Sequence, residues 1–347
     1  MAPTATEFLH DFNAQLALFV GELEQIHKQS AQEDVFQPTF WLQSDDFKLA
    51  RDVFVAAGGT IEHEITKFSL VFSKTALPSQ DEASSICEAI KKPCEQLLAA
   101  TKVALFCGAG PSLGDEIILG ALRVLKNVRE LGATVEKKEL ARVPELTGRV
   151  WESCKAIGNT PKSNCIASKR NMLQCVGVLN DTIKELKEFL EEQAATSGEE
   201  GLDAVELEDE FAFDSSLSDE ERALFESGVK LLEMVVSLLK RGVLTLKNLT
   251  IEDSAKDVIA WTARLDRCYK AVQSAVVDMG AALYPPVDVD ELQGALSLVD
   301  SAGRAVLESL LAQQELSEKE SHALEHGCRA FDQQVAMVKT QLDAART

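Results

Sequence analysis

Apolar side chains recur at intervals of four and three residues in two long stretches of this chain. This spacing places side chains on one face of an α-helix, whereas a half-buried strand alternates with a period of two. The pattern therefore predicts long helices that bury one side, and it favours an all-α fold. The stretches comprise Met172, Val176, Leu179, Ile183, Leu186 and Leu190, and Phe225, Val229, Leu232, Val236, Leu239, Val243 and Leu246.

Helix signals cover most of the remaining sequence. Ser79 with Glu82, and Ser218 with Glu221, have the spacing of capping boxes, which mark helix starts. Low aromatic content (6%) and few prolines (9) also suit helices better than a β-sandwich. We expect a first helix of roughly 25 residues that includes Phe8 to Ile26, a second over about 39–73, and a third that starts at Ser79 and precedes the chain break at 108–111. Further helices are expected over about 112–131, 138–157, 163–194, 218–246, 253–283, 288–313 and 317–345.

Two positions are expected to disturb these helices. Gly58 and Gly59 lie together inside the second one and should bend or break it. Pro93 lies inside the third and should kink it, because proline removes an internal hydrogen bond.

A strongly acidic run divides the chain. Residues 191–221 contain 13 acidic residues and no Lys or Arg, against a net charge of −21 for the whole chain. Packing such a run would bring like charges together, so it predicts a solvated, flexible linker over 195–217. An acidic segment that binds a partner is the alternative. The predicted organisation is thus an N-terminal bundle over 1–194 and a C-terminal bundle over 218–347.

Composition argues against several classes of function. The chain has 35 Lys and Arg against 56 Asp and Glu, and this charge disfavours direct binding to nucleic acid or to an anionic membrane. No stretch approaches 18 apolar residues, and the N-terminus lacks the pattern of a secretory signal. The eight scattered cysteines include no Cys-x-x-Cys pair, which favours reduced thiols in a cytosolic or nuclear protein without zinc.

One segment imitates a dinucleotide-binding turn. Val103–Gly114 reads as a strand followed by a glycine-rich turn and a helix, and the Gly108–Gly114 turn would then hold a pyrophosphate in an NAD(P)-dependent oxidoreductase. The third glycine is displaced, however, because Leu113 occupies its position, and Pro111 removes an amide donor. We therefore expect a helix end, a turn and a new helix, and we predict no cofactor.

Two histidines imitate a zinc site. His322 and His326 fit the H-x-x-E-H pattern, in which both imidazoles share one helix face. No Glu follows His326 to supply a third ligand, so we expect an exposed helix face and no metal. The sequence shows no pattern typical of a catalytic triad either, and we expect that the chain is not an enzyme.

Four leucines fall at seven-residue intervals and imitate a leucine zipper. The same helix carries a second apolar row from Phe225 to Leu246, which favours burial in a bundle core over a single dimer seam. No basic region precedes the leucines, so a DNA-reading zipper is excluded on charge. The leucines are Leu217, Leu224, Leu231 and Leu238.

Three residues are candidate phosphorylation sites. Thr160 precedes a proline, and Ser197 and Ser218 each have Glu three residues later. For Ser218, a capping role explains the same spacing. No residue is assigned at this point to catalysis, cofactor, metal or partner binding.

Short motifs in a consistent order resemble the cyclin-D-binding protein family, also called the Grap- and cyclin-D-interacting proteins. Their order and spacing agree over residues 40–345. The motifs are Phe40-Trp41, Val71-Phe72-Ser73, Leu77-Pro78-Ser79, Val150-Trp151, Leu217–Glu221, and Asp278 with Leu283-Tyr284-Pro285-Pro286.

The resemblance implies two antiparallel helical bundles similar to vinculin and talin rod modules. It further implies a non-enzymatic protein of the nucleus and cytoplasm that binds cyclin D and helix-loop-helix factors, sequesters them and so restrains the cell cycle. A vinculin-like cytoskeletal adaptor and the NAD(P)-dependent oxidoreductase remain the alternatives.

Overall fold

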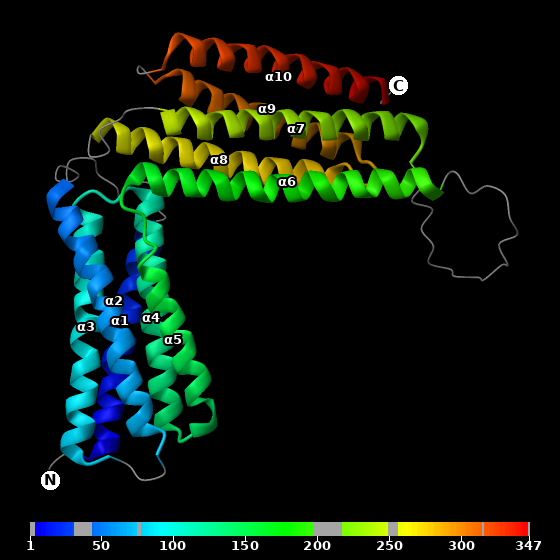
Figure 1. Ribbon diagram of the computed structural model, residues 1–347. Coiled ribbons are helices and arrows are strands. Elements are labelled where there is room, and N and C mark those ends of the chain that lie inside the picture. The colour runs from blue at the N-terminus through cyan, green and yellow to red at the C-terminus, as the bar shows by residue number, and fades with distance from the viewer. Residues whose placement is uncertain are drawn as a thin grey trace, which may run out of the picture. The chain divides into compact units, whose positions relative to one another are not determined.

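The computed structural model describes residues 4–30, 44–74, 78–196, 217–248, 256–313 and 316–345 (Figure 1). These residues form α-helices joined by short connections, with no strand among them, so the predicted all-α bundle fold is confirmed. The helices are α1 (Ala5–Ser30), α2 (Ser44–Phe72), α3 (Gln80–Phe106), α4 (Pro111–Glu136), α5 (Val143–Ile157), α6 (Asn164–Thr196), α7 (Asp219–Asn248), α8 (Lys256–Ala282), α9 (Val289–Leu311) and α10 (Glu318–Ala345), and the 3₁₀ turn η2 covers Leu140–Arg142.

Both predicted capping boxes form. The Ser79 hydroxyl accepts a hydrogen bond from the Glu82 amide (3.3 Å), and the Glu82 carboxylate accepts one from the Ser79 amide (3.1 Å). Ser218 and Glu221 make the same reciprocal pair before α7, at 3.2 and 2.9 Å. These bonds satisfy amide donors that lack partners at a helix start.

The glycine pair in α2 does not break the helix; a break was one of the two predicted outcomes. α2 is continuous through Gly58 and Gly59. A β-carbon at Gly58 would lie 3.2 Å from the Ile157 side chain, so the glycine there allows α5 to pack closely against α2. Pro93 is accommodated within α3, where it is buried.

The chain divides into two compact units. The first comprises residues 1–167 and 252–263, and the second comprises 168–251 and 264–347. The division therefore falls inside α6 and inside α8, and it differs from the predicted boundary at the acidic run. Residues 197–216 of that run lie outside the described residues. Whether 1–194 and 218–347 act as separate domains stays a prediction.

The first unit is a bundle in which α1 packs against α3 and α4, α2 against α3 and α5, and α4 against α5. Its core is aliphatic and aromatic, and one of its centres is the tilted stacking of Phe68 on Phe72, with ring centroids 4.6 Å apart. At the bundle edge, the Glu136 carboxylate accepts hydrogen bonds from the Asn13 amide (2.7 Å) and from the His10 imidazole (2.9 Å).

In the second unit, α7 is the central helix, and α10 packs against both α7 and α9 (Figure 1). The buried Gln334 amide on α10 donates to the Ser227 carbonyl on α7 at 3.0 Å. Phe225, Phe189 and Tyr284 form a cluster of aromatic rings with centroids 5.0–6.1 Å apart. This cluster packs α6 and the segment just after α8 against α7.

The side chain of Tyr269 connects α8 to α7. Its side chain is fully buried, and its hydroxyl donates a 2.6 Å hydrogen bond to the Leu239 carbonyl. Burial raises the pKa of the Tyr269 hydroxyl well above its ordinary value, so this group stays a donor. Gly242 lies directly against the hydroxyl, where any side chain would collide with it.

Candidate functional site

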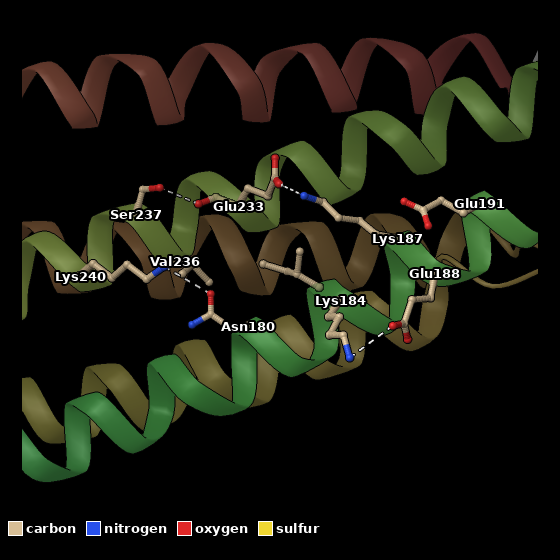
Figure 2. Close-up of a pocket in the computed structure, with 10 residues that line it drawn as sticks. Asn180, Lys184, Lys187, Glu188, Glu191, Glu233, Val236, Ser237 and Lys240 are labelled. Atoms are coloured by element: carbon tan, nitrogen blue, oxygen red, sulfur yellow. Dashed lines mark hydrogen bonds and ion pairs between the residues drawn. The ribbon is translucent and has the colours of Figure 1, made fainter.

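A groove of about 680 Å³ runs along the second unit between α6 and α7 (Figure 2). Ile183 and Val236 lie at its floor and are only 7% and 3% exposed. Polar and charged side chains line the rest of the groove. They are Asn180, Lys184, Lys187, Glu188 and Glu191 from α6 and Glu233, Ser237 and Lys240 from α7.

Two polar contacts cross the groove and hold its walls together. The Lys240 ammonium donates to the Asn180 side-chain oxygen at 3.3 Å, and the Lys187 ammonium pairs with the Glu233 carboxylate. A third pair, Lys184 with Glu188 at 3.3 Å, lies along α6 (Figure 2). All these groups are largely exposed, and exposed ion pairs contribute roughly 0–1 kcal/mol each. The charged side chains of the groove can therefore change their hydrogen-bonding partners at a low cost in free energy.

The helical pattern of the sequence explains why this groove forms. The α7 residues Glu233, Ser237 and Lys240 follow one another at intervals of four and three, so they share one helix face. Lys187 and Asn180 lie seven residues apart on α6 and share a face in the same way. The two charged faces meet at the surface, while the adjacent apolar rows of both helices pack inside.

The lining of the groove is mainly charged and polar around an apolar floor. Its lining includes no cysteine, histidine or metal-ligand cluster. Over the part of the chain that the structure describes, no group of three or more His, Cys, Asp or Glu side chains is placed to hold a metal ion. Three lysines and three glutamates around an apolar floor instead suit a peptide segment that carries both charges.

The glycine-rich turn is a helix–turn–helix connection, as predicted from its displaced glycine. Residues 103–106 are the last residues of α3, and α4 begins at Pro111. The Asn164 side chain fills the turn, because its oxygen accepts from the Gly110 amide (2.7 Å) and its nitrogen donates to the Gly108 carbonyl (2.8 Å). A β-carbon at Gly110 would lie 3.0 Å from that oxygen, so packing explains this glycine.

The two histidines of the zinc-like motif lie on α10. The His322 imidazole is 3.7 Å from the Glu325 carboxylate, the central acid of the motif, and both side chains are exposed. The predicted exposed helix face agrees with this arrangement.

Three of the four heptad leucines lie inside the bundle, as predicted, whereas Leu217 precedes α7 and is half-buried. Leu224, Leu231 and Leu238 are buried, and so is the second apolar row of α7 from Phe225 to Leu246. Both rows are used in packing within one chain, which is why α7 lies at the centre of the second unit.

The three candidate phosphorylation sites differ in accessibility. Thr160 is 8% exposed, and its carbonyl accepts a 2.8 Å hydrogen bond from the Arg51 guanidinium. Ser218 is exposed and caps α7. Ser197 lies outside the described residues. Phosphorylation at these residues stays a prediction.

None of the polar groove residues was singled out from the sequence, whereas Ile183 and Val236 at the floor belong to the two predicted apolar rows. Lysines and glutamates are spread over most of the described helices, and only the pairing of α6 with α7 brings these particular ones together. The available signal was the seven-residue spacing of polar residues beside each apolar row, which does not say which rows become neighbours.

Within the described residues, no helix combines the length and apolar composition needed to cross a membrane. A model of the family described as "Grap2 and cyclin-D-interacting, N-terminal" matches residues 54–192.

Similar proteins cover most of the chain. The Cyclin-D1-binding protein 1 homolog of Danio rerio is 26% identical over 261 residues, which are 71% of this chain and 73% of that protein. The Xenopus laevis homolog is 26% identical over 65% of this chain and 68% of its own. Cyclin-D1-binding protein 1 of Homo sapiens is 21% identical over 81% and 78%. The resemblance to the cyclin-D-binding proteins is therefore confirmed: residues 54–192 match the model of the Grap2 and cyclin-D-interacting family, and the similar proteins extend over most of the chain.

Proposed function

We propose that this chain is a non-enzymatic interaction protein that binds D-type cyclins. The observation that carries the proposal is the family match over residues 54–192, together with relatives named for binding cyclin D1. The all-helical architecture supports it, because helical bundles present grooves that accept partner helices. The lining of the groove supports it too, since its lysines and glutamates offer complementary charges to a partner segment.

Calorimetric titration of the full chain with a purified D-type cyclin tests this proposal. We expect saturable binding at one site per chain, and much weaker binding to a cyclin of another class. The absence of binding heat, together with no co-elution on size exclusion at about 50 μM of each protein, would refute it.

We further propose that binding sequesters the cyclin and so restrains cell-cycle entry. Sequestration requires that the chain and the cyclin's kinase partner compete for the cyclin. Added chain should therefore reduce the activity of a reconstituted cyclin D–kinase pair, and excess kinase subunit should restore it. A ternary complex with unchanged activity would leave binding intact and remove sequestration.

We also propose that the chain binds helix-loop-helix factors and that it is present in both the nucleus and the cytoplasm. The net charge of −21 supports action through protein contacts without touching DNA. Pull-down with purified helix-loop-helix domains, and imaging of the tagged chain, test these two parts separately.

A further inference from the structure

Acidic residues are distributed very unevenly along α6 and α7. Residues 168–180 of α6 and 234–248 of α7 contain five Lys or Arg and no Asp or Glu. The remaining parts of these two helices in the second unit, 181–196 and 219–233, contain ten acidic and four basic residues. In a chain with a net charge of −21, two stretches without a single carboxylate side chain are a departure from the overall composition.

The two stretches without acidic residues lie side by side. Lys240 contacts Asn180 and Lys187 contacts Glu233, so residue numbers rise along α6 as they fall along α7. The two helices are therefore antiparallel neighbours (Figure 1). Beyond the Lys240–Asn180 contact, the first half of α6 faces the last half of α7, and their basic residues share one end of the helix pair.

Two leucines are exposed among these basic residues. Leu173 precedes Asn180 by seven residues, and Leu244 follows Lys240 by four, so each leucine lies on the same helix face as that neighbour. Their side chains are 51% and 49% exposed. We call the whole area the cationic α6–α7 surface. It comprises Lys169, Arg170 and Leu173 of α6 and Lys240, Arg241, Leu244 and Lys247 of α7.

The cationic α6–α7 surface carries a positive net charge. Its five basic side chains are at least partly exposed. The Lys240 ammonium donates to the side-chain oxygen of Asn180, a neutral acceptor, so this contact does not neutralise it (Figure 2). The connection 249–255 that follows α7 contains two acidic residues and lies outside the described residues. Five positive charges exceed these two negative ones.

We propose that this surface binds an acidic segment of a partner protein that carries apolar side chains among its carboxylates. The inference rests on the proposed function as an interaction protein, and it adds the site and the chemistry of the ligand. Carboxylates of the partner pair with Lys240, Arg241 and Lys247, and its apolar side chains pack on Leu173 and Leu244. Complementary charge supplies specificity and fast association, and apolar burial supplies affinity.

The acidic run of the same chain cannot cover this surface. Leu173 precedes Thr196 by 23 residues, so roughly 35 Å of helix separates it from the end of α6. Residues 197–216 join that end of α6 to the start of α7 and must go out and return. Ten residues span at most about 36 Å when fully extended. The run would reach Leu173 only with its tip, and no residues would remain to lie on the surface.

A second copy of the chain is disfavoured by charge. Two chains that each carry a net charge of −21 repel one another over the distances at which they first meet. The occupant is therefore a segment of a different protein.

Three peptides of about 16 residues test the chemistry of the ligand. The first combines glutamates with interspersed leucines, the second replaces the leucines with serine, and the third replaces the glutamates with lysine. Fluorescence anisotropy with the full chain should show at least about tenfold tighter binding of the first peptide than of either control. Its affinity should fall as salt rises from about 50 to 500 mM, because salt screens the charges.

Two results of the peptide experiment would overturn the inference. One is the absence of binding by the first peptide. The other is equal binding of the leucine-free peptide, or displacement of the first peptide by an RNA oligonucleotide of equal charge. Either form of that second result would assign the surface to polyanions in general.

Paired charge reversals locate the binding site. Arg241→Glu with Lys247→Glu should weaken binding of the first peptide at least about tenfold. Lys230→Glu with Lys319→Glu changes the net charge equally at exposed lysines outside the surface, and it should leave the affinity within about twofold. Leu244→Ala should weaken binding without lowering the melting temperature. Equal losses in both charge-reversal variants would assign binding to the overall charge and overturn the inference.

Further outcomes separate this inference from its neighbours. Peptide binding without binding of a D-type cyclin would refute the proposed function and support the surface, whereas cyclin binding without peptide binding would do the reverse. A peptide of residues 197–216 that binds as tightly as the first peptide, together with self-association of the full chain in light scattering, would make a second copy the occupant. The proposal of a different protein would then be overturned.

Discussion

At Gly242, a missing side chain makes room for a hydrogen bond between two helices. The Tyr269 hydroxyl reaches the Leu239 carbonyl through the space that a β-carbon would occupy. We expect Gly242→Ala to lower the free energy of unfolding by roughly 1–3 kcal/mol, as overpacking usually does. Gly294→Ala, on an open face of α9, should instead raise it by about 0.5–1 kcal/mol.

A double-mutant cycle identifies the colliding atom. Tyr269→Phe removes the hydroxyl oxygen, so Gly242→Ala should cost less in that background, with a coupling of about 0.5–3 kcal/mol. Chemical denaturation of the four proteins measures it. Additive effects would show that Gly242 is required for another reason.

The His10–Glu136 pair makes part of the stability depend on pH. The Glu136 carboxylate raises the pKa of His10 above its ordinary 6.5, and the hydrogen bond from His10 lowers the pKa of Glu136 below its ordinary 4.5. The histidine contribution is therefore complete below pH 6.5 and lost as pH rises through the raised pKa. The glutamate contribution is complete above pH 4.5 and lost as pH falls through the lowered pKa.

Thermal melts of His10→Gln against the parent protein test this dependence. The melting temperature should differ most between about pH 4.5 and 6.5 and converge near pH 8.5. The difference will be small, because the His10 side chain is 71% exposed. In a Glu136→Gln background it should vanish, and a difference that persists there would assign the effect to another partner of His10.

At the scale of the element, substitutions in α7 distinguish packing in the bundle core from dimerisation through a leucine zipper. Leu232 and Leu239 are fully or almost fully buried. Leu232→Ala or Leu239→Ala should reduce the free energy of unfolding by roughly 2–5 kcal/mol. Leu244→Ala, on the exposed face of the same helix, should change it by less than about 0.5 kcal/mol. Denaturation combined with light scattering measures both quantities, and loss of a dimer at unchanged stability would instead support a zipper.

Elements whose signal is local were predictable, and features that depend on which helices meet were not. Each capping box, at Ser79 and at Ser218, is contained in four consecutive residues and predicts a helix start. The spacing of the apolar row in α7 likewise predicts which face of that helix is buried. Gly58 suggested a bend or a break in α2, but its role is to leave room for the side chain of Ile157. That residue lies about a hundred residues later in the sequence, so no local pattern indicates the contact. The groove escaped for the same reason, since Lys187 and Glu233 become neighbours only once α6 and α7 are paired.

At the scale of the whole molecule, the position of the unit boundary has consequences for fragments. Residues 168–196 of α6 belong to the second unit, where Leu179, Ile183 and Leu186 are buried. A fragment 218–347 lacks them and exposes the apolar surface that they cover.

We expect the fragment 164–347 to melt cooperatively and the fragment 218–347 to lose cooperative melting or to aggregate. Circular dichroism during heating and dispersion of amide proton shifts measure the difference. Cooperative melting of 218–347 at the temperature of the longer fragment would show that α6 is dispensable to the second unit.

The buried cysteines allow the transient opening of each unit to be measured separately by thiol labelling. None of the eight cysteines forms a disulfide, and burial raises the pKa of Cys87 and Cys154 to about 12 and that of Cys175 to about 11. Thiolates are then scarce at neutral pH, and a thiol reagent reacts only during transient opening. Labelling kinetics at Cys154 report on the first unit and at Cys175 on the second. A ligand that binds α6 and α7 should slow labelling of Cys175 and leave the rate at Cys154 unchanged.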